Sequence, residues 1–251
     1  MILIVNADDL GANQPVNDEI FDLMHAGAVT SASLMCNAPG FEHAVRQIPR
    51  LPQCSFGIHL NLTVFAPLST SGNLEPVLDE NGHLSKKTLK IKITPALREA
   101  LLQELTLQVQ RAFDASVPVS HFDSHHHVHT IPELFPALKS LQRKFGVRKV
   151  RSTINLLPEG HKMSFFRSLK KKAFNFSLRH SYATRCPDGL GDFRDFYKLL
   201  EAGRIPRYRA LELMVHPGAT TAKYVDEVTA LRSGWHDLLP PEVKIGSYHS
   251  I

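Results

Sequence analysis

The chain has 251 residues, 43% of them apolar and 21% charged, a balance that excludes a disordered or collagen-like protein. The formal charge of +5 favours anionic partners only weakly, and three scattered cysteines do not form the pattern of a disulfide framework or a cysteine-based zinc site. No secretory signal or membrane-spanning segment is expected, so the sequence predicts one cytoplasmic domain over residues 1–251. Among its fourteen histidines, five lie between His121 and His129.

Short apolar runs alternate with longer amphipathic stretches along most of the chain. Strands are expected at residues 2–7, 32–37, 56–62, 121–126, 149–152 and 211–216. Helices are expected at residues 17–25, 96–113 and 132–145. Residues 64–93 are rich in Gly, Pro, Ser and Lys and predict a large loop insertion, and residues 182–195 predict a second irregular region. The alternation indicates an α/β fold with a parallel sheet, either open and doubly wound or closed into a barrel.

The predicted strands become polar at their carboxyl ends, where parallel α/β folds build their active sites. Each of these polar residues could instead be a hydrogen-bonded group in a turn, but four strands show the same change. The residues at these four ends are Asp8 and Asp9, His59 and Asn61, Asp123 and His125, and His216.

The histidine tract runs His121-Phe-Asp-Ser-His-His-His-Val-His129. If the strand continues through it, the alternation of side chains places His121, Asp123, His125 and His127 on one face. That face would offer a carboxylate and imidazoles to a metal ion. The alternative is a histidine-rich turn on the surface.

Asp8 and Asp9 are adjacent carboxylates, and a site that tolerates both usually holds a cation beside them. Both can reach one site only if the chain turns, which Gly11 would allow. Asp9 could instead cap the following helix. One Asp and two His from three strands would form a His₂–carboxylate set with open positions, typical of a catalytic metal site. His216, beside such a metal, would suit a general acid.

Residues 162–180 predict a basic amphipathic helix that contains Lys170-Lys171-Lys172, with Phe166, Leu169, Ala173 and Phe176 at helical spacing. One interpretation is a barrel helix with a solvated charged face, and the other is a helix that lies on a membrane surface. The chain has no Walker A loop, G-x-S-x-G or H-E-x-x-H motif. No nucleic-acid partner is expected.

Six segments of this chain resemble the YdjC-like carbohydrate deacetylase family, which includes chitooligosaccharide deacetylases and hopanoid-associated deacetylases. The resemblance implies a distorted (β/α) barrel related to polysaccharide deacetylases and a divalent metal, usually assigned as magnesium. It also implies hydrolysis of the N-acetyl group of an amino sugar. The six segments are Ile4-Val-Asn-Ala-Asp-Asp-Leu-Gly11, Val29-Thr-Ser31, Gly57-Ile-His59, the histidine tract, Leu213-Met-Val-His-Pro217 and Gly246-Ser-Tyr248.

Carried over by position, the resemblance implies metal ligands at Asp9, His59 and His125 and a catalytic base at Asp8. His216 matches a late-strand catalytic histidine, and Arg151 is similar to an arginine that steadies the base. Two imidazoles suit zinc or another transition metal better than magnesium, so both remain open. The expected substrate is an N-acetylated amino sugar, in an oligosaccharide or in a glycolipid that the 162–180 helix would meet at a membrane. A homodimer is also compatible with the sequence.

Two other functions remain open at this point. A glycoside hydrolase on a barrel needs two carboxylates about 5–9 Å apart on separate strand ends, which the neighbours Asp8 and Asp9 do not provide. A non-catalytic sugar- or metal-binding protein would need neither Asp8 nor His216 for binding alone.

Overall fold

The structure, a computed structural model, describes residues 1–157, 163–219 and 222–251. Within these residues seven strands form one parallel sheet. The strands are β1 (Ile2–Leu10), β2 (Ser31–Leu34), β3 (Ser55–Leu60), β4 (Val119–Ser124), β5 (Gly189–Asp192), β6 (Ala210–Val215) and β7 (Lys244–Gly246). The α-helices are α1 (Gln14–His25), α2 (Phe41–Gln47), α3 (Pro95–Asp114), α4 (Phe135–Phe145), α5 (Phe165–His180), α6 (Phe193–Glu201) and α7 (Ala222–Arg232).

The strands follow the order β4-β3-β2-β1-β6-β5, and β7 also pairs with β1. β7 and β2 lie on the same side of β1 and pair with different parts of it. β7 pairs with the start of β1, from Ile2, and β2 pairs with its end, from Asn6. Its residues from Leu3 to Asp8 are buried, as expected for a central strand of a parallel sheet.

The two edge strands of this sheet are joined through an irregular segment, residues 149–155. Val150 bridges Phe122 of β4, and Asn155 bridges Leu190 of β5. The sheet therefore curves round into a distorted barrel, as the family resemblance implies.

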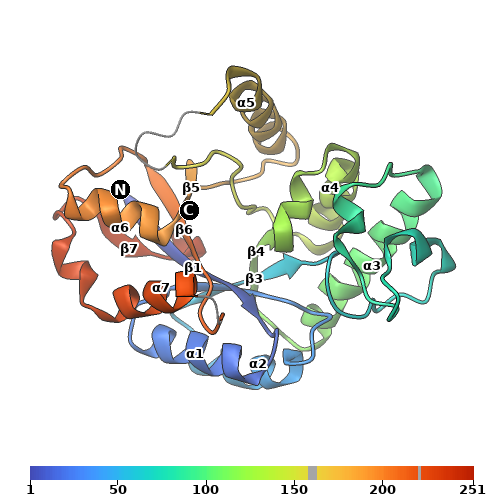
Figure 1. Cartoon of the computed structure of the whole chain (residues 1–251), viewed down its shortest axis with the longest axis horizontal. Coiled ribbons are helices and arrows are strands. Elements are labelled where there is room, and N and C mark those ends of the chain that lie inside the picture. The colour runs from blue at the N-terminus through green and yellow to red at the C-terminus, as the bar shows by residue number, and fades with distance from the viewer. Residues whose placement is uncertain (158–162, 220–221) are drawn as a thin grey trace.

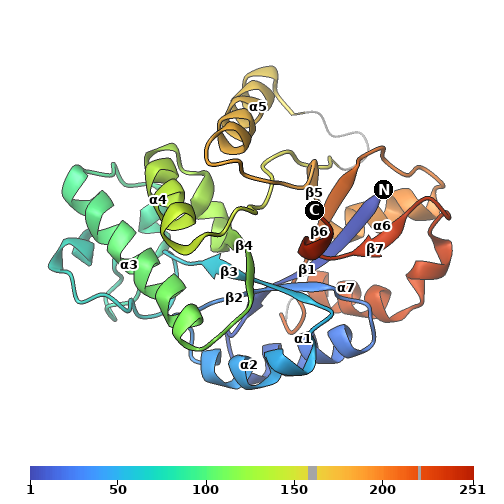
Figure 2. The same cartoon turned by 180° about the vertical axis from the view of Figure 1, so that it is seen from behind.

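The helices surround the strands (Figures 1 and 2): α1 and α2 lie on one side, α3 and α4 on a second, and α6 and α7 on a third. α5 stands apart from the others, at the top of both views. Among the described residues, no helix combines the length and apolar character needed to cross a membrane.

Two predictions about secondary structure are wrong. Residues 149–152 form no strand, because their pairing is limited to isolated bridges on either side, Val150 with Phe122 and Lys149 with Arg185. Residues 182–195 are not wholly irregular, since they contain β5 and the start of α6. This short strand was not predicted because its glycines have a low intrinsic preference for strands. It forms because β5 pairs along its whole length with β6.

The other predicted elements form with shifted ends. The helix expected at residues 96–113 is α3, and the one expected at 132–145 begins with a 3₁₀ turn, Pro132–Leu134, before α4. Between β3 and α3 the chain contains two 3₁₀ turns, Gly72–Val77 and Lys86–Leu89, in the region predicted as a loop. The helix expected at 162–180 is α5, and Lys162 lies outside the described residues.

Candidate metal centre and active site

The carboxyl end of β1 contains a bulge that brings two adjacent carboxylates to one site. The register between β1 and β2 shifts between Ala7 and Leu10, and Asp9 has a φ of 66°. In a regular strand the side chains of Asp8 and Asp9 would point to opposite faces, and this left-handed conformation turns both towards the same site. Asp9 Oδ1 therefore lies 3.3 Å from His59 Nε2, and Asp8 Oδ2 lies 3.9 Å from the same nitrogen.

Two expectations about this turn need correction. Gly11 has a positive φ of 93°, but the turn that reunites the carboxylates occurs two residues earlier, at Asp9 itself. Asp9 does not cap α1. Asn13 is the cap, because its side chain accepts a hydrogen bond of 3.0 Å from the backbone N–H of Val16.

The histidine tract does not continue as a strand. β4 ends at Ser124, and His126 and His127 adopt positive φ values of 49° and 56°. The prediction of strand alternation through His127 is therefore wrong. The turn directs His125 to Asp9, with 2.9 Å between His125 Nδ1 and Asp9 Oδ1.

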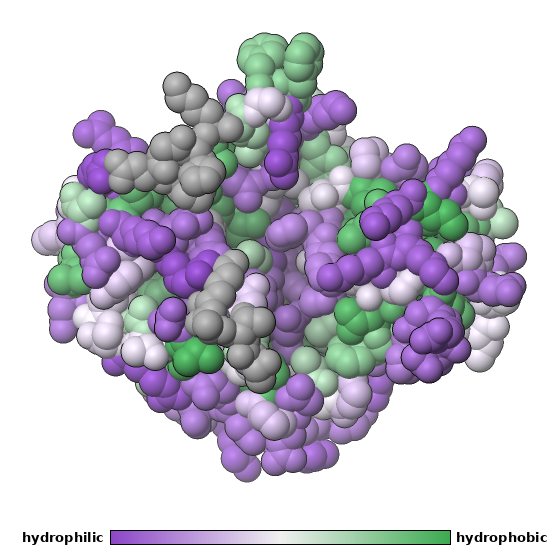
Figure 3. Space-filling model, in the orientation of Figure 1, coloured by the Kyte–Doolittle hydropathy of each residue, from purple (hydrophilic) through white to green (hydrophobic). Residues whose placement is uncertain are grey.

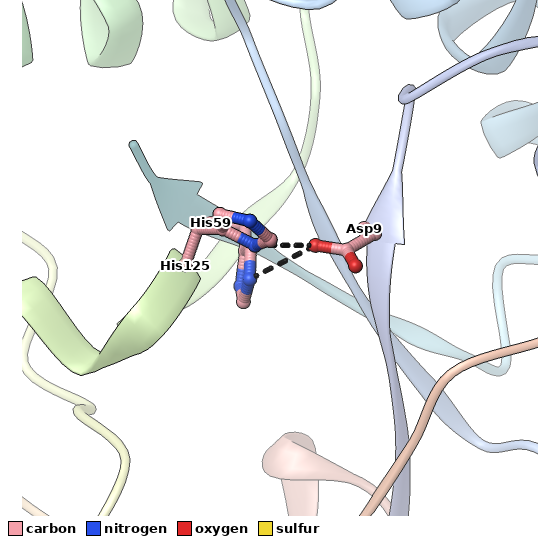
Figure 4. Close-up of side chains that lie close together, drawn as sticks. All are labelled: Asp9, His59 and His125. Carbon is pink, nitrogen blue, oxygen red and sulfur yellow. Dashed lines mark hydrogen bonds and ion pairs between the residues drawn. The ribbon is translucent and has the colours of Figure 1, made fainter. Parts of the chain in front are cut away.

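Asp9, His59 and His125 converge from three elements (Figure 4). One carboxylate oxygen and one nitrogen from each ring lie within 4.8 Å of one another. The Asp9 and His125 side chains are 26% and 19% exposed, whereas that of His59 is 2% exposed. These three residues could hold a divalent cation that remains open to further ligands on its exposed side.

Asp123 orients His59 from behind. Its Oδ1 lies 2.9 Å from His59 Nδ1, and its Oδ2 accepts a hydrogen bond of 2.8 Å from the Ser33 hydroxyl. When Nδ1 donates its proton to Asp123, the Nε2 lone pair of His59 points towards Asp9 and is free for a metal. The sequence predicts that Asp123 lies on the strand face offered to a metal, whereas in the structure its carboxylate supports His59.

The charge around His59 also suits a cation. Burial would lower the pKa of His59, but Asp123 and Asp8 raise it to about 10. The two carboxylates thus stabilise a positive charge at His59 Nε2. Either a proton or a metal ion can supply that charge. A second cluster, Asp8 with His59 and Asp123, has similar spacing. Its two carboxylates already bind Arg151, so the set that includes Asp9 suits a metal better.

Arg151 is fully buried and joins three carboxylates. Its guanidinium donates to Asp8 at 2.5 and 2.8 Å and to Glu212 at 2.8 and 3.0 Å, and it lies 2.8 Å from Asp123. Burial would raise the pKa of Asp8, but the charges of Arg151 and His59 outweigh it and lower that pKa. Asp8 is therefore ionised at neutral pH.

Glu212, Tyr248 and Gly57 also belong to this network, and no role is predicted for any of them. Glu212 accepts a 2.7 Å hydrogen bond from the Tyr248 hydroxyl, and the Tyr248 ring stacks on His121 with 3.5 Å between centroids. Gly57 makes room for this stack, because a Cβ atom there would lie 2.4 Å from the His121 ring. The contact between Glu212 and Tyr248 spans 36 residues, so no local sequence pattern predicts it.

Replacing Arg151 with Met is expected to lower the free energy of unfolding by about 3–5 kcal/mol, because three buried carboxylates lose their shared cation. Urea denaturation measures the change. The control is Arg232→Met, which removes a partly exposed ion pair with Glu19 and should cost no more than about 1 kcal/mol. Equal losses in both variants would contradict the supporting role of Arg151.

His216 follows β6 and lies beside Asp8, with 3.9 Å between His216 Nε2 and Asp8 Oδ2. Its side chain is 19% exposed, and burial lowers its pKa. Its Nδ1 has no hydrogen-bond partner among the described residues. All six residues predicted for the site thus fall in one cluster around Asp8 and His59.

A cavity of about 710 Å³ opens beside this cluster. Met214 lines it and is also in contact with Arg151, 3.8 Å from sulfur to nitrogen. His127, from the turn after β4, lines the same cavity, and α5 forms another wall through Arg167 and Lys171. The cavity is large enough for a small-molecule ligand. None of the six predicted site residues lines it, and it adjoins the cluster through His127 and Met214.

The match to a family model covers nearly the whole described barrel. Residues 2–237 match the model of the YdjC-like protein family. The chain belongs to this family. A carbohydrate deacetylase of Brevibacillus brevis is 30% identical over 98% of this YdjC-like chain and 90% of its own length. One from Geobacillus stearothermophilus is 37% identical over 59% of this chain, and that alignment covers 60% of the relative, less than two thirds of its length.

Solved structures support the fold of this YdjC-like chain. A protein of Enterococcus faecalis, described as a candidate cellobiose-phosphate cleavage protein, superposes with a TM-score of 0.78 at 22% identity, over 99% of this chain and 98% of its own. A lactam utilization protein of Thermus thermophilus gives 0.52 at 14% identity, over 98% of this chain and 100% of its own. At these identities the similarity concerns the fold alone.

Proposed function

We propose that this chain is a divalent-metal-dependent deacetylase that hydrolyses the N-acetyl group of an amino sugar. The observation that carries the proposal is the convergence of Asp9, His59 and His125 next to an ionised Asp8. The relatives named carbohydrate deacetylases support the choice of substrate class.

Asp9, His59 and His125 are the residues that would hold the cation. When bound, a divalent cation lowers the pKa of water and polarises a carbonyl oxygen, which is the chemistry that amide hydrolysis requires. Asp123 keeps His59 in the orientation needed for binding. Two imidazole ligands favour zinc or another transition metal, whereas the family resemblance implies magnesium.

Asp8 is the general base in this proposal. It is ionised, lies at the carboxyl end of β1 and is next to the ligand Asp9, so it can accept a proton from an attacking water. Arg151 holds both of its oxygens, and Asn6 donates a further hydrogen bond of 2.9 Å to Oδ1. These contacts fix the carboxylate in one orientation before substrate binds.

His216 is the general acid. Amide nitrogen leaves poorly until it is protonated. His216 Nε2 and the Nε2 of the proposed ligand His59 each lie 3.9 Å from Asp8 Oδ2, so His216 is close to the reacting groups. Its ring contacts that of Tyr224, 4.8 Å between centroids, which limits the motion of the imidazole. A proton taken up by Asp8 has only 3.9 Å to travel to His216 Nε2.

The test is an assay of both possible products from N-acetylated chitooligosaccharides. A deacetylase releases acetate and leaves the chain length of the sugar unchanged, so acetate should rise while reducing ends stay constant. New reducing ends without acetate would indicate a glycoside hydrolase. Tight binding of the sugar with neither product would indicate a non-catalytic binding protein, and either result would overturn the proposal.

A further inference from the structure

α5 is attached to the barrel by one narrow face. Leu178 is fully buried, and the Asn175 side chain is buried and accepts a hydrogen bond from the Ser152 hydroxyl. Phe174 makes an edge-to-face contact with Phe135 of α4, with 5.5 Å between ring centroids. Residues 174, 175 and 178 therefore mark the side of α5 that faces the protein.

The apolar stripe of α5 lies on the opposite side and is exposed. Phe165 is 74% exposed, Phe166 75%, Leu169 53% and Phe176 63%. Figure 3 shows hydrophobic side chains at the top of the molecule, where α5 projects. The interpretation of this segment as a barrel helix with a solvated charged face is therefore incomplete, because the apolar stripe is exposed as well. Its periodicity is that of an amphipathic helix, but the side that packs on the barrel is not the apolar one.

Basic residues border the exposed stripe. At about 3.6 residues per turn, Lys172 falls on one side of it and Lys170 on the other. Both are exposed, and α5 contains no acidic residue. A second copy of this chain would bring two helices of like charge together, so its α5 is a poor partner for this face. An apolar stripe with flanking cations is complementary to a surface that has an apolar interior and anionic groups at its boundary with water.

We propose that α5 docks this protein onto an anionic lipid bilayer. The phenylalanines and Leu169 enter the boundary between headgroups and acyl chains, while Lys170 and Lys172 meet the lipid phosphates. Every residue of the stripe is already exposed, so docking requires no change in the barrel.

Docking also positions the cavity that adjoins the candidate active site. The same helix that carries the stripe forms a wall of that cavity through Arg167, Lys170, Lys171 and Phe174. A docked protein would hold this wall at the membrane surface.

The experiment is co-sedimentation with phosphatidylcholine vesicles that contain or lack phosphatidylglycerol, at low and high salt. The protein should bind only the anionic vesicles, and binding should weaken at high salt. The double variant Phe165→Ser with Phe166→Ser should bind at least about tenfold more weakly. Its control, Leu89→Ser with Leu238→Ser, changes two hydrophobic residues that are 42% and 53% exposed elsewhere and should bind as the parent does.

A matched pair tests the charges. Lys170→Glu with Lys172→Glu should weaken binding by at least about tenfold, whereas Lys90→Glu with Lys92→Glu makes the same change in net charge on an exposed loop and should have much less effect. Equal effects of the two pairs, or no binding by the parent protein, would overturn the proposal. Loss of a dimer in the phenylalanine variant, without vesicle binding by the parent, would assign the face to a second copy instead.

Acetate release from soluble diacetylchitobiose is measured in parallel. It should be unchanged in the phenylalanine variant, because neither residue lines the cavity. Vesicle binding without acetate release by the parent would support docking and contradict the proposed function, so the two failures are distinguishable.

Discussion

Replacing Asp8 with Asn is expected to lower the rate of acetate release by about 10²–10⁴-fold, the usual contribution of a general base. The variant cannot accept the proton of the attacking water. It should retain the bound metal, because Asp9, His59 and His125 are intact. The rate is measured at saturating substrate, together with the metal content by elemental analysis.

The neighbouring variant Asp9→Asn is the control for this assignment. It should weaken metal affinity, so that excess cation restores part of its activity, whereas excess cation should not restore Asp8→Asn. Because the bulge at Asp9 brings the two carboxylates to 3.3 and 3.9 Å from His59 Nε2, distance alone does not separate their roles. The opposite pattern of rescue would exchange base and ligand.

Replacing His125 with Ala is expected to abolish stoichiometric metal binding while the fold is retained. His125 is partly exposed and lies after the end of β4, so its removal leaves the barrel core intact. His59→Ala should also lose the metal, but it leaves the buried Asp123 without its 2.9 Å contact and should be less stable as well. Elemental analysis and circular dichroism measure the two effects.

His127→Ala is the matched control for this pair. It removes a histidine of the same tract that lies outside the Asp9 cluster and lines the cavity instead. It should keep one metal ion per chain. Full metal content in His125→Ala, or metal loss in His127→Ala, would show that the ligand assignment is wrong.

The convergence of these residues could be predicted because it depends on a rule of parallel sheets. Strands in one such sheet point the same way, so Asp8, His59 and His216 were expected at one edge from the order of apolar and polar residues. The distances between the site residues could not be predicted. The positions of Asp9 and His125 depend on left-handed conformations at Asp9, His126 and His127. The two-residue period that identifies a strand contains no information about where the strand is interrupted.

The buried support of the site had even less local signal. Arg151 lies on a segment with too little pairing to be a strand, and its partners Asp8 and Glu212 are 143 and 61 residues away. α5 shows a different limit. Periodicity located its apolar stripe, but the side that a helix turns to the protein depends on which residues find partners, here Asn175 and Leu178.

Removal and return of the metal tests the central claim most directly. The protein is treated with a chelator, dialysed and assayed for acetate release from diacetylchitobiose, then titrated separately with Mg²⁺, Zn²⁺ and Co²⁺. We expect the metal-free protein to remain folded but release no acetate, and one equivalent of a divalent cation per chain to restore release. Full acetate release by protein shown to be free of metal would contradict the claim.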